Sequence, residues 1–208
     1  MITDGLNPFT VLLFLGAVVA GMTLIVLYVF ARVTKREPVA RITLRLLLGG
    51  AGLYVVLFLL ASITSHSRVL AVGEEKHICE VDCHLAYAVA ATKTEALSNG
   101  RVRETVTIKV RFDETTISAR RPRDAALTPN SRYVGLVDDA GNRYLGSTEG
   151  LKRTLIPGES YTTDIVFDVP ADARDLRLVL RNDDPETVFI IGHENSLFHG
   201  RTTFRLRA

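Results

Sequence analysis

The sequence predicts a membrane α-helical hairpin followed by an all-β domain that folds as an antiparallel β-sandwich. Two apolar runs, Thr10–Phe30 and Leu46–Ile63, contain no charged residue. A basic stretch, Arg32–Arg45, lies between them. The rest of the chain contains several short segments in which apolar and polar residues alternate, which is the pattern of half-buried strands.

Each apolar run has a composition suited to crossing a bilayer. A spanning helix needs roughly 20 mostly apolar residues, and Thr10–Phe30 provides that length. Leu46–Ile63 is shorter, and Ile42 and Leu44 extend it toward the basic stretch. A soluble core helix would show a polar face every three or four residues, and neither run does. A cleaved signal peptide would carry positive charge before its apolar run, whereas Met1–Pro8 offers only one acid.

Charge predicts the orientation of the hairpin. The basic stretch holds one acid and five cationic residues, namely Arg32, Lys35, Arg36, Arg41 and Arg45. Short loops rich in Lys and Arg stay in the cytoplasm. We therefore place the loop 32–45 inside the cell, and both the N-terminus and the C-terminus outside it.

The division of charge along the chain narrows the choice of partners. Residues 1–70 hold six Lys and Arg against two Asp and Glu, a net charge of +4. Residues 71–208 hold 19 against 21, a net charge of −2. Nucleic-acid binding requires a clustered basic face, so we expect no nucleic-acid partner. The predicted partners are the lipid bilayer and another envelope or membrane protein.

Strand and turn signals alternate from residue 77 to the end of the chain. In Thr105–Asp113 the alternation is strict, with Val106, Ile108, Val110 and Phe112 on one side. The other expected strands are Leu85–Thr92, Tyr133–Asp138, Arg143–Leu145, Tyr161–Val169, Leu176–Arg181, Val188–Ile191 and Thr202–Arg207. Short strands at this spacing predict an immunoglobulin-like sandwich. We assign 1–66 to the hairpin, 67–76 to a stalk and 77–208 to the sandwich.

Three turn and strand-end motifs carry a family resemblance. They are Asp139-Ala-Gly141, Leu155-Ile-Pro-Gly-Glu159 and Phe167-Asp-Val-Pro170. With them, Thr105–Arg181 resembles the telokin-like, immunoglobulin-like domains of unknown function on bacterial extracytoplasmic proteins. The resemblance implies the fold only. With the two apolar runs and the basic stretch, it leads us to expect a two-span protein of a bacterial inner membrane with its domain on the periplasmic or extracellular side. It implies no catalytic residues.

The two cysteines, Cys79 and Cys83, are expected to form a disulfide. The predicted topology places them in an oxidising compartment, where an even number of cysteines favours pairing. Four residues apart in a non-helical segment, they can reach the Cα separation that a disulfide requires. Such a bond would pin the junction between the stalk and the first strand.

A metal or redox site is the alternative interpretation of the same stretch. His77, Cys79, Cys83 and His84 supply two imidazoles and two thiols, which suit copper or zinc. Two spans before an exterior β-domain also resemble cytochrome c oxidase subunit II. The Cys spacing matches that family's copper motif, but His84 directly follows Cys83 and no Met follows. The stretch also resembles a lengthened c-type haem attachment motif, again without a Met in the domain. We expect no cofactor.

The second polar cluster contains His193, Glu194, Asn195, Ser196 and His199. The simpler interpretation is a loop whose Asn and Ser satisfy their own backbone. The alternative is a ligand-binding loop, because function often lies on loops.

The sequence does not predict catalysis. It has no nucleophile-elbow motif, and its paired carboxylates, Asp138-Asp139 and Asp183-Asp184, lie in predicted turns. We therefore expect no enzyme. The function we predict is a membrane-anchored extracytoplasmic interaction module that binds or scaffolds another envelope protein, with a metal- or redox-carrying accessory protein as the alternative.

Overall fold

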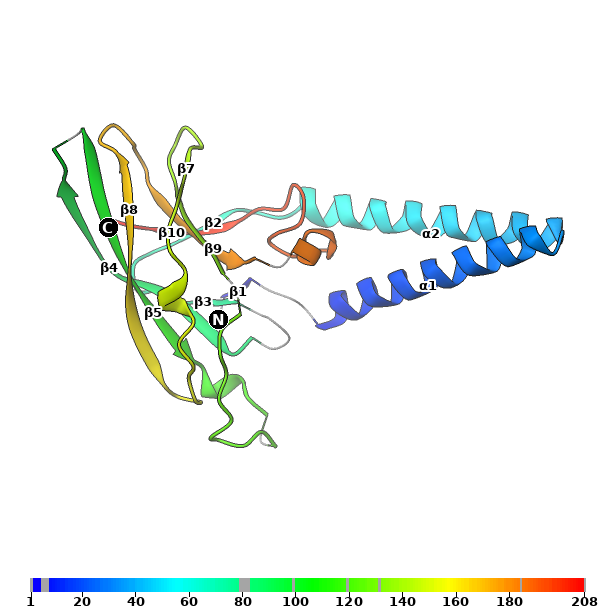
Figure 1. The fold of residues 1–208 in the computed structure, drawn as a ribbon, viewed down its shortest axis with the longest axis horizontal. Coiled ribbons are helices and arrows are strands. Elements are labelled where there is room, and N and C mark those ends of the chain that lie inside the picture. Colours follow the sequence, from blue (N-terminus) through cyan, green and yellow to red (C-terminus); the bar gives the residue numbers. More distant parts are fainter. Residues whose placement is uncertain are drawn as a thin grey trace. The chain divides into compact units, whose positions relative to one another are not determined.

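The computed structural model describes residues 2–4, 8–78, 83–98, 100–118, 120–130, 132–183 and 185–207. The chain forms two compact units (Figure 1). The sandwich unit comprises Met1–Leu6, His66–Pro185 and Gly200–Ala208. The hairpin unit comprises Asn7–Ser65 and Glu186–His199. Each unit is described separately below.

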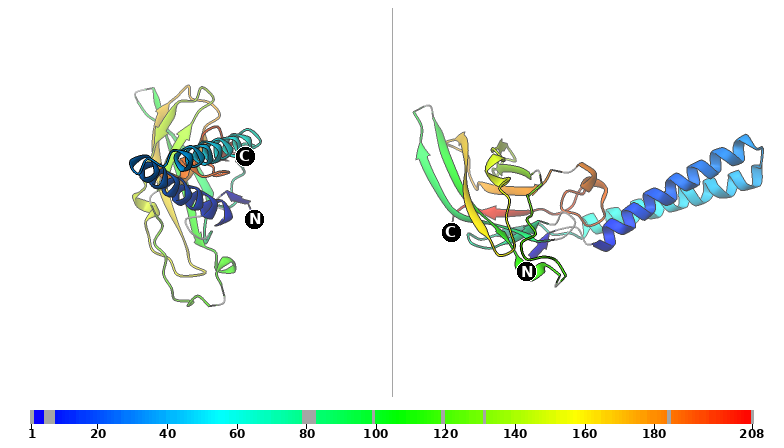
Figure 2. Two further views of the ribbon diagram at one scale, coloured as in Figure 1. Left: turned by 90° about the vertical axis from the view of Figure 1, so that its right-hand side faces the viewer. Right: turned by 60° about the horizontal axis from the view of Figure 1, so that its bottom comes forward.

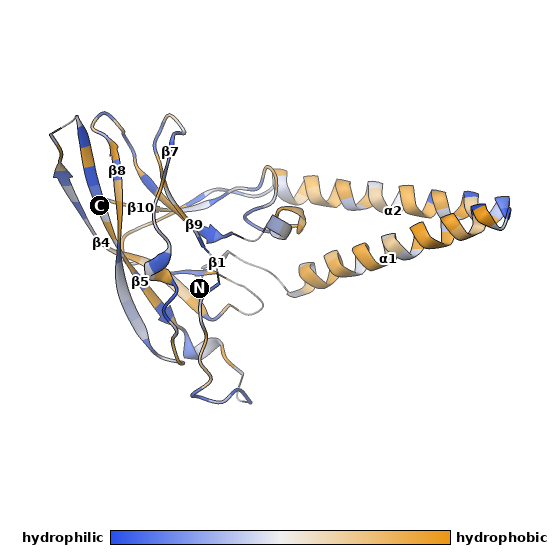
Figure 3. Cartoon of the chain, viewed as in Figure 1, coloured by the Kyte–Doolittle hydropathy of each residue, from blue (hydrophilic) through white to orange (hydrophobic). Residues whose placement is uncertain are grey.

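Two long helices, α1 (Pro8–Val33) and α2 (Glu37–Ile63), make up most of the hairpin unit. They run side by side from the turn that joins them (Figure 2). Both are long and apolar enough to cross a membrane, as judged by length and composition. Figure 3 shows apolar residues along both helices and hydrophilic ones at the turn. The apolar side chains are largely exposed, whereas a helix in a soluble core would bury most of them.

The turn between the helices is tighter than the predicted loop Arg32–Arg45. Only residues 34–36 lie between the helices, and both Arg41 and Arg45 belong to α2. Pro38 explains the early start of α2, because its fixed φ suits the first turn of a helix and its missing N–H is not needed there. Lys35 and Arg36 therefore lie in the turn, and Arg32, Arg41 and Arg45 lie on the adjoining helices.

The sandwich unit consists of two five-stranded sheets. The first has the order β1 (Ile2–Asp4), β3 (Lys76–Ile78), β4 (Leu85–Ala96), β5 (Arg101–Phe112) and β8 (Ser160–Pro170). The second has the order β2 (Arg68–Leu70), β10 (Thr202–Arg205), β9 (Arg177–Asn182), β6 (Arg132–Val137) and β7 (Arg143–Leu145). Short 3₁₀ helices, η1 (Glu114–Thr116) and η2 (Glu149–Leu151), lie in the connections. A third, η3 (Pro185–Phe189), follows β9.

A single hydrophobic core lies between the two sheets. The first sheet contributes the buried Tyr87, Val110 and Phe112, and the second contributes Leu136 and Phe204. In β5 the predicted alternation is confirmed, because Val106, Ile108, Val110 and Phe112 are all buried. The sequence prediction of a β-sandwich is thus confirmed by strands of both sheets facing one core.

The sheets are mixed, which corrects the prediction of a purely antiparallel sandwich. β1 pairs with β3 in parallel, and β2 pairs with β10 in parallel. The other recorded ladders are antiparallel. Parallel neighbours need a long crossover connection. Both parallel pairs meet this condition, because α1 and α2 lie between β1 and β3, and most of the sandwich lies between β2 and β10.

Two local predictions are wrong. The predicted stalk 67–76 contains β2, which is hydrogen-bonded into the second sheet, and ends on the first residue of β3. The predicted strand Val188–Ile191 is instead the end of η3 followed by a turn. A run of four apolar residues has too few positions for periodicity to separate a strand from a helical turn.

Candidate functional site

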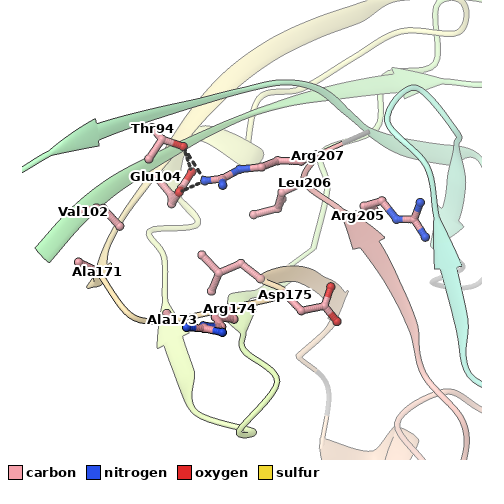
Figure 4. Close-up of a pocket in the computed structure, with 11 residues that line it drawn as sticks. Thr94, Val102, Glu104, Ala171, Ala173, Arg174, Asp175, Arg205, Leu206 and Arg207 are labelled. Carbon is pink, nitrogen blue, oxygen red and sulfur yellow. Dashed lines mark hydrogen bonds and ion pairs between the residues drawn. The ribbon is translucent and has the colours of Figure 1, made fainter.

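A pocket of about 500 Å³ opens in the sandwich unit, and Figure 4 shows the residues that line it. It lies between β4 and β5 of one sheet, the end of β10 in the other, and the connection from β8 to β9. Val102, Leu176 and Leu206 provide apolar lining. Strand ends and a connection therefore meet here around a cavity large enough for a small ligand or a few side chains.

Glu104 is the buried carboxylate of this pocket, with only 1% of its surface exposed. Thr94 Oγ1 donates a hydrogen bond to Glu104 Oε2 at 2.7 Å, and Arg207 Nη2 donates one to Oε1 at 2.6 Å. Arg207 also donates to Thr94 Oγ1 at 2.9 Å, which closes the triad (Figure 4). Arg207 therefore neutralises the negative charge of Glu104, while the Arg207 side chain itself stays largely exposed.

The rest of the pocket carries excess positive charge. Of the acids that line it, Glu104 is paired with Arg207, and Asp175 is paired with Arg177 outside the pocket. Arg174 and Arg205 also line the pocket, and neither has an ion pair within the described ranges. Figure 4 shows the Arg205 side chain directed away from the other lining residues, so Arg174 is the guanidinium that could bind a carboxylate carrying an apolar group.

A second polar network lies where β3, β5 and η1 meet. His77 Nε2 and Asp113 Oδ2 are 3.0 Å apart, and both side chains are buried. Asp113 Oδ1 accepts hydrogen bonds from the backbone N–H and the hydroxyl of Thr115, at 3.0 and 2.7 Å. Burial raises the pKa of Asp113, but the hydrogen bonds from His77 and Thr115 outweigh it, so the pKa lies well below its ordinary value.

Arg111 extends this network to the surface. Its Nη1 lies 3.3 Å from Asp113 Oδ1, and its Nε and Nη2 donate to Glu75 at 2.9 and 2.6 Å. The hydrogen bonds from Arg111 hold the pKa of Glu75 below its usual value. The Nδ1 atom of His77 is buried and has no hydrogen-bond partner among the described residues. Among the atoms of this network named above, His77 Nδ1 is the one without a hydrogen-bond or ion-pair partner in the described part of the chain.

The structure tests the predicted Cys and His cluster only in part. Cys79 lies outside the described residues, and with it the predicted disulfide to Cys83. His84 stacks on Phe112 with ring centroids 5.6 Å apart, and its Nδ1 lies 2.6 Å from Thr116 Oγ1. Across the described ranges, no group of three or more His, Cys, Asp or Glu side chains is arranged to hold a metal ion.

The predicted binding loop is mostly buried. His193, Glu194, Asn195 and Ser196 are all less than 10% exposed, and His199 is half-buried. Asn195 Nδ2 donates to Thr187 Oγ1 at 2.8 Å, the Asn195 N–H donates to His193 Nδ1 at 3.0 Å, and the Ser196 hydroxyl donates to the carbonyl of Ile190. The Asn195 side chain thus bonds another side chain of the segment, and the Ser196 hydroxyl bonds a backbone carbonyl.

The pocket residues were missed by sequence reasoning. Glu104 continues the inward-facing set of β5, because it lies two positions before Val106. The sequence signal that could have revealed the pocket is a charged residue at a position where the alternation of β5 predicts a core-facing side chain. Its partner Arg207 is 103 residues away, and nothing in the sequence connects the two.

No family model and no curated protein matches this chain. Among solved structures it is similar to an uncharacterised β-sandwich protein of Clostridium difficile 630, with 9% identity, a TM-score of 0.40, and coverage of 69% of this chain and 96% of that one. It is similar to the secreted protein MPT63 of Mycobacterium tuberculosis, with 14% identity, a TM-score of 0.43, and coverage of 68% and 99%. A conserved hypothetical protein of Bacillus anthracis has 15% identity, a TM-score of 0.38, and coverage of 55% and 92%. Likenesses at this level carry no information about activity or partners.

Proposed function

We propose that this chain is a membrane-anchored interaction module, in which a two-span hairpin displays a β-sandwich outside a bacterial cytoplasmic membrane. The surface of the hairpin unit is the observation that carries the proposal. Leu12, Val19 and Ile63 are 67%, 65% and 74% exposed on helices long enough to span a bilayer. Apolar surface left in water is unfavourable by about 25 cal/mol per Å², and a bilayer removes that penalty.

The hydroxyl groups of the hairpin support the same environment. Thr23 of α1 and Thr43 of α2 each donate a hydrogen bond to the carbonyl four residues earlier, at 2.8 and 2.9 Å. Hydrocarbon offers no hydrogen-bond partner, so a hydroxyl within a span is best satisfied by its own helix. These bonds satisfy the hydroxyls of Thr23 and Thr43 within their own helices.

The orientation rests on the charges at the turn. Arg32, Lys35, Arg36, Arg41 and Arg45 lie on and beside the short turn, and Glu37 is ion-paired with Arg32 at 2.9 Å. Cationic residues next to short loops remain in the cytoplasm. The turn then lies inside the cell, and the sandwich lies on the periplasmic or extracellular side.

The immunoglobulin-like assignment of the sandwich is part of this proposal. The order β4-β5-β8 in one sheet and β10-β9-β6 in the other corresponds to strands A-B-E and G-F-C of an immunoglobulin sandwich. Domains of this type commonly serve as scaffolds with loops for binding, which suits a displayed module.

The pocket of Figure 4 is the contact site we assign to the module. Its apolar lining residues can contact an apolar side chain of a partner, and Arg174 is available for a carboxylate. The partner we propose is therefore another envelope protein, bound through an acidic residue that adjoins an apolar one. Arginine is well suited to such contacts because its guanidinium binds carboxylates through two parallel hydrogen bonds.

Site-directed photocrosslinking in intact cells tests this assignment. A photoreactive amino acid at Ala173, inside the pocket, should give an adduct of one discrete mass. The same probe at the exposed Leu145 on β7 is the control and should give none. The variant Arg174→Glu should abolish the adduct at Ala173. Equal adducts at both positions, or persistence of the adduct after charge reversal, would contradict the assignment.

Metal binding is a second candidate function, and the environment of His77 favours it. Its Nε2 meets the Asp113 carboxylate, while its buried Nδ1 has no hydrogen-bond partner in the described part of the chain. A carboxylate that orients one ring nitrogen while the other faces a metal is a common arrangement around metal ions. In this alternative the cysteine thiolates and His84 would complete the ligand set.

We favour a Cys79–Cys83 disulfide over that alternative. Ile78 of β3 pairs with Leu85 of β4, so both cysteines lie in the connection between two paired residues. Sulfurs joined to each other cannot act as thiolate ligands. Thiol labelling of the unfolded, unreduced protein should find no free cysteine, and reduction should release two. Stoichiometric copper or zinc in freshly isolated protein, with two labelled thiols after chelation, would establish the metal site instead.

A further inference from the structure

The segment 186–199 of the hairpin unit places polar side chains inside and apolar ones outside. His193, Asn195 and Ser196 are buried, and hydrogen bonds join them to other groups of the same segment. Phe189 and Phe198 are 59% and 78% exposed. Leu197 is also exposed, and no described charged side chain of the segment is. The segment therefore presents an apolar surface on a scaffold of hydrogen-bonded polar groups.

This segment is bonded to a helix that we assign to the membrane. Tyr54 of α2 donates its hydroxyl to the carbonyl of Phe189 at 2.7 Å. Tyr54 lies nine positions before Ile63, roughly 13 Å along the axis at 1.5 Å per residue. The tyrosine is therefore rooted within the apolar part of the span. Figure 1 shows η3 beside the C-terminal end of α2.

The backbone at Phe198 is held in a conformation that side chains disfavour. Its φ of 64° is left-handed, which is rare and unfavourable for a bulky residue. Turn hydrogen bonds flank it, from the Ser196 N–H to the His193 carbonyl at 2.9 Å and from the His199 N–H to the Ser196 carbonyl at 3.1 Å. A strained turn that exposes an aromatic ring suggests that the ring has a role outside the fold.

We propose that residues 186–199 form an interfacial anchor that inserts Phe189, Leu197 and Phe198 into the outer leaflet beside the spans. This inference rests on the proposed membrane function of the hairpin. Lipid is the occupant because the segment is continuous with the spans through Tyr54, and because exposed aromatic and leucine side chains without charge are typical of the membrane interface. The anchor would add apolar contact with the bilayer beyond that of the two helices.

Tryptophan fluorescence can test the anchor cleanly, because the chain contains no Trp. Four single-Trp variants of the full chain are compared in phosphatidylcholine and phosphatidylglycerol vesicles, with and without lipids brominated on their acyl chains. Phe198→Trp reports the anchor, and Val19→Trp, on an exposed position of α1, reports the spans. Leu145→Trp, on an exposed position of β7, is the control away from lipid. Bromination in both leaflets makes the result independent of vesicle orientation.

We expect bromolipids to quench most of the emission of Phe198→Trp and Val19→Trp, and to leave Leu145→Trp unchanged. Bromines near the headgroup should quench Phe198→Trp more strongly than Val19→Trp, and bromines deep in the acyl chains the reverse. Phe189→Trp is a second reporter, so the test does not depend on one substitution. If Val19→Trp is quenched while both segment reporters resemble Leu145→Trp, the anchor is rejected and the hairpin stands. If Val19→Trp also escapes quenching, the proposed membrane function itself fails.

Discussion

The two units of this chain place their apolar residues in opposite ways. In the sandwich unit, Val110 is completely buried, with Phe112 and Leu136 in the same core. In the hairpin unit, Val19 is 65% exposed, and Thr43 is among the few buried helix residues. Valine is thus buried in the sandwich unit and exposed in the hairpin unit. This difference is what our proposal requires, in which water surrounds the sandwich and lipid surrounds the hairpin.

The largest effect we expect is in the sandwich core. Val110→Asp places a carboxylate among apolar side chains in β5, and the cost of desolvating it should lower the free energy of unfolding by about 4 kcal/mol. Chemical denaturation of the purified chain in detergent measures this. The matched control, Leu145→Asp on an exposed apolar position of β7, should change stability by less than about 0.5 kcal/mol. Similar losses in both variants would mean that the inward face is assigned wrongly.

Aspartate at an exposed position of the hairpin tests whether the hairpin and the sandwich lie in different solvents. Val19 and Leu145 are both more than half exposed, so in water Asp would be tolerated at either position. If α1 spans a bilayer, Val19→Asp near its centre should instead disfavour insertion by about 3 kcal/mol. A glycosylation-reporter insertion assay on the full chain measures the shift. If the fraction of chains inserted in the membrane does not change, exposed positions of the hairpin and of the sandwich do not differ in their solvent.

A smaller effect should come from the buried network of the sandwich. Asp113→Asn keeps the shape but removes the charge that faces His77 and Arg111, and should lower the free energy of unfolding by about 2 kcal/mol at neutral pH. The pKa of Asp113 is lower in the folded chain than in the unfolded chain. Its charge therefore stabilises the fold above the ordinary Asp pKa of about 3.9, and this contribution is lost as the pH falls through the folded value.

Unfolding curves at neutral and acidic pH check this prediction. The gap between wild type and Asp113→Asn should be widest at neutral pH and narrow progressively below about pH 4. Asp168→Asn, which breaks the exposed pair with Arg103, is the control and should differ from wild type by less than about 0.5 kcal/mol. A gap that does not depend on pH would show that charge at Asp113 contributes nothing to stability.

The smallest effect concerns the bond between α2 and the segment 186–199. Tyr54→Phe removes one hydroxyl bond to the Phe189 carbonyl and should destabilise the closed segment by about 1 kcal/mol, or roughly fivefold in its opening equilibrium. Hydrogen exchange of the amides in 187–199 measures the opening. Amides of β5 in the same sample should be unaffected. Faster exchange in β5 as well would indicate global rather than local opening.

Sequence patterns predicted the elements that depend on local periodicity. The alternation in β5 and the two apolar runs identified a half-buried strand and two helices, because each pattern repeats over many residues. The three-residue strand β2 and the first residue of β3 were assigned to a stalk, because so short a strand has no period of its own. Their existence depends on partners distant in the chain, such as β10 for β2.

The remaining differences between prediction and structure arise where a sequence pattern is ambiguous, or where residues far apart in the chain meet in the fold. Val188–Ile191 is a short apolar run, which periodicity alone cannot assign to a strand or a helical turn, and it belongs to the hairpin unit rather than the sandwich. The pocket was not predicted because Thr94, Glu104 and Arg207 meet only through the fold. The inward position of Glu104 in the β5 pattern was the one local sign of it.

Topology mapping tests most directly whether the hairpin spans a membrane and displays the sandwich outside. Alkaline phosphatase, which is active only outside the cytoplasm, is fused after residue 38 in one chain and after residue 208 in another. The cationic residues at the turn predict an inactive fusion at 38 and an active one at 208, with both fusions retained in membranes after alkaline carbonate washing. Activity at 38 with none at 208 would reverse the orientation, and release of the fusions by carbonate would contradict the membrane-spanning hairpin.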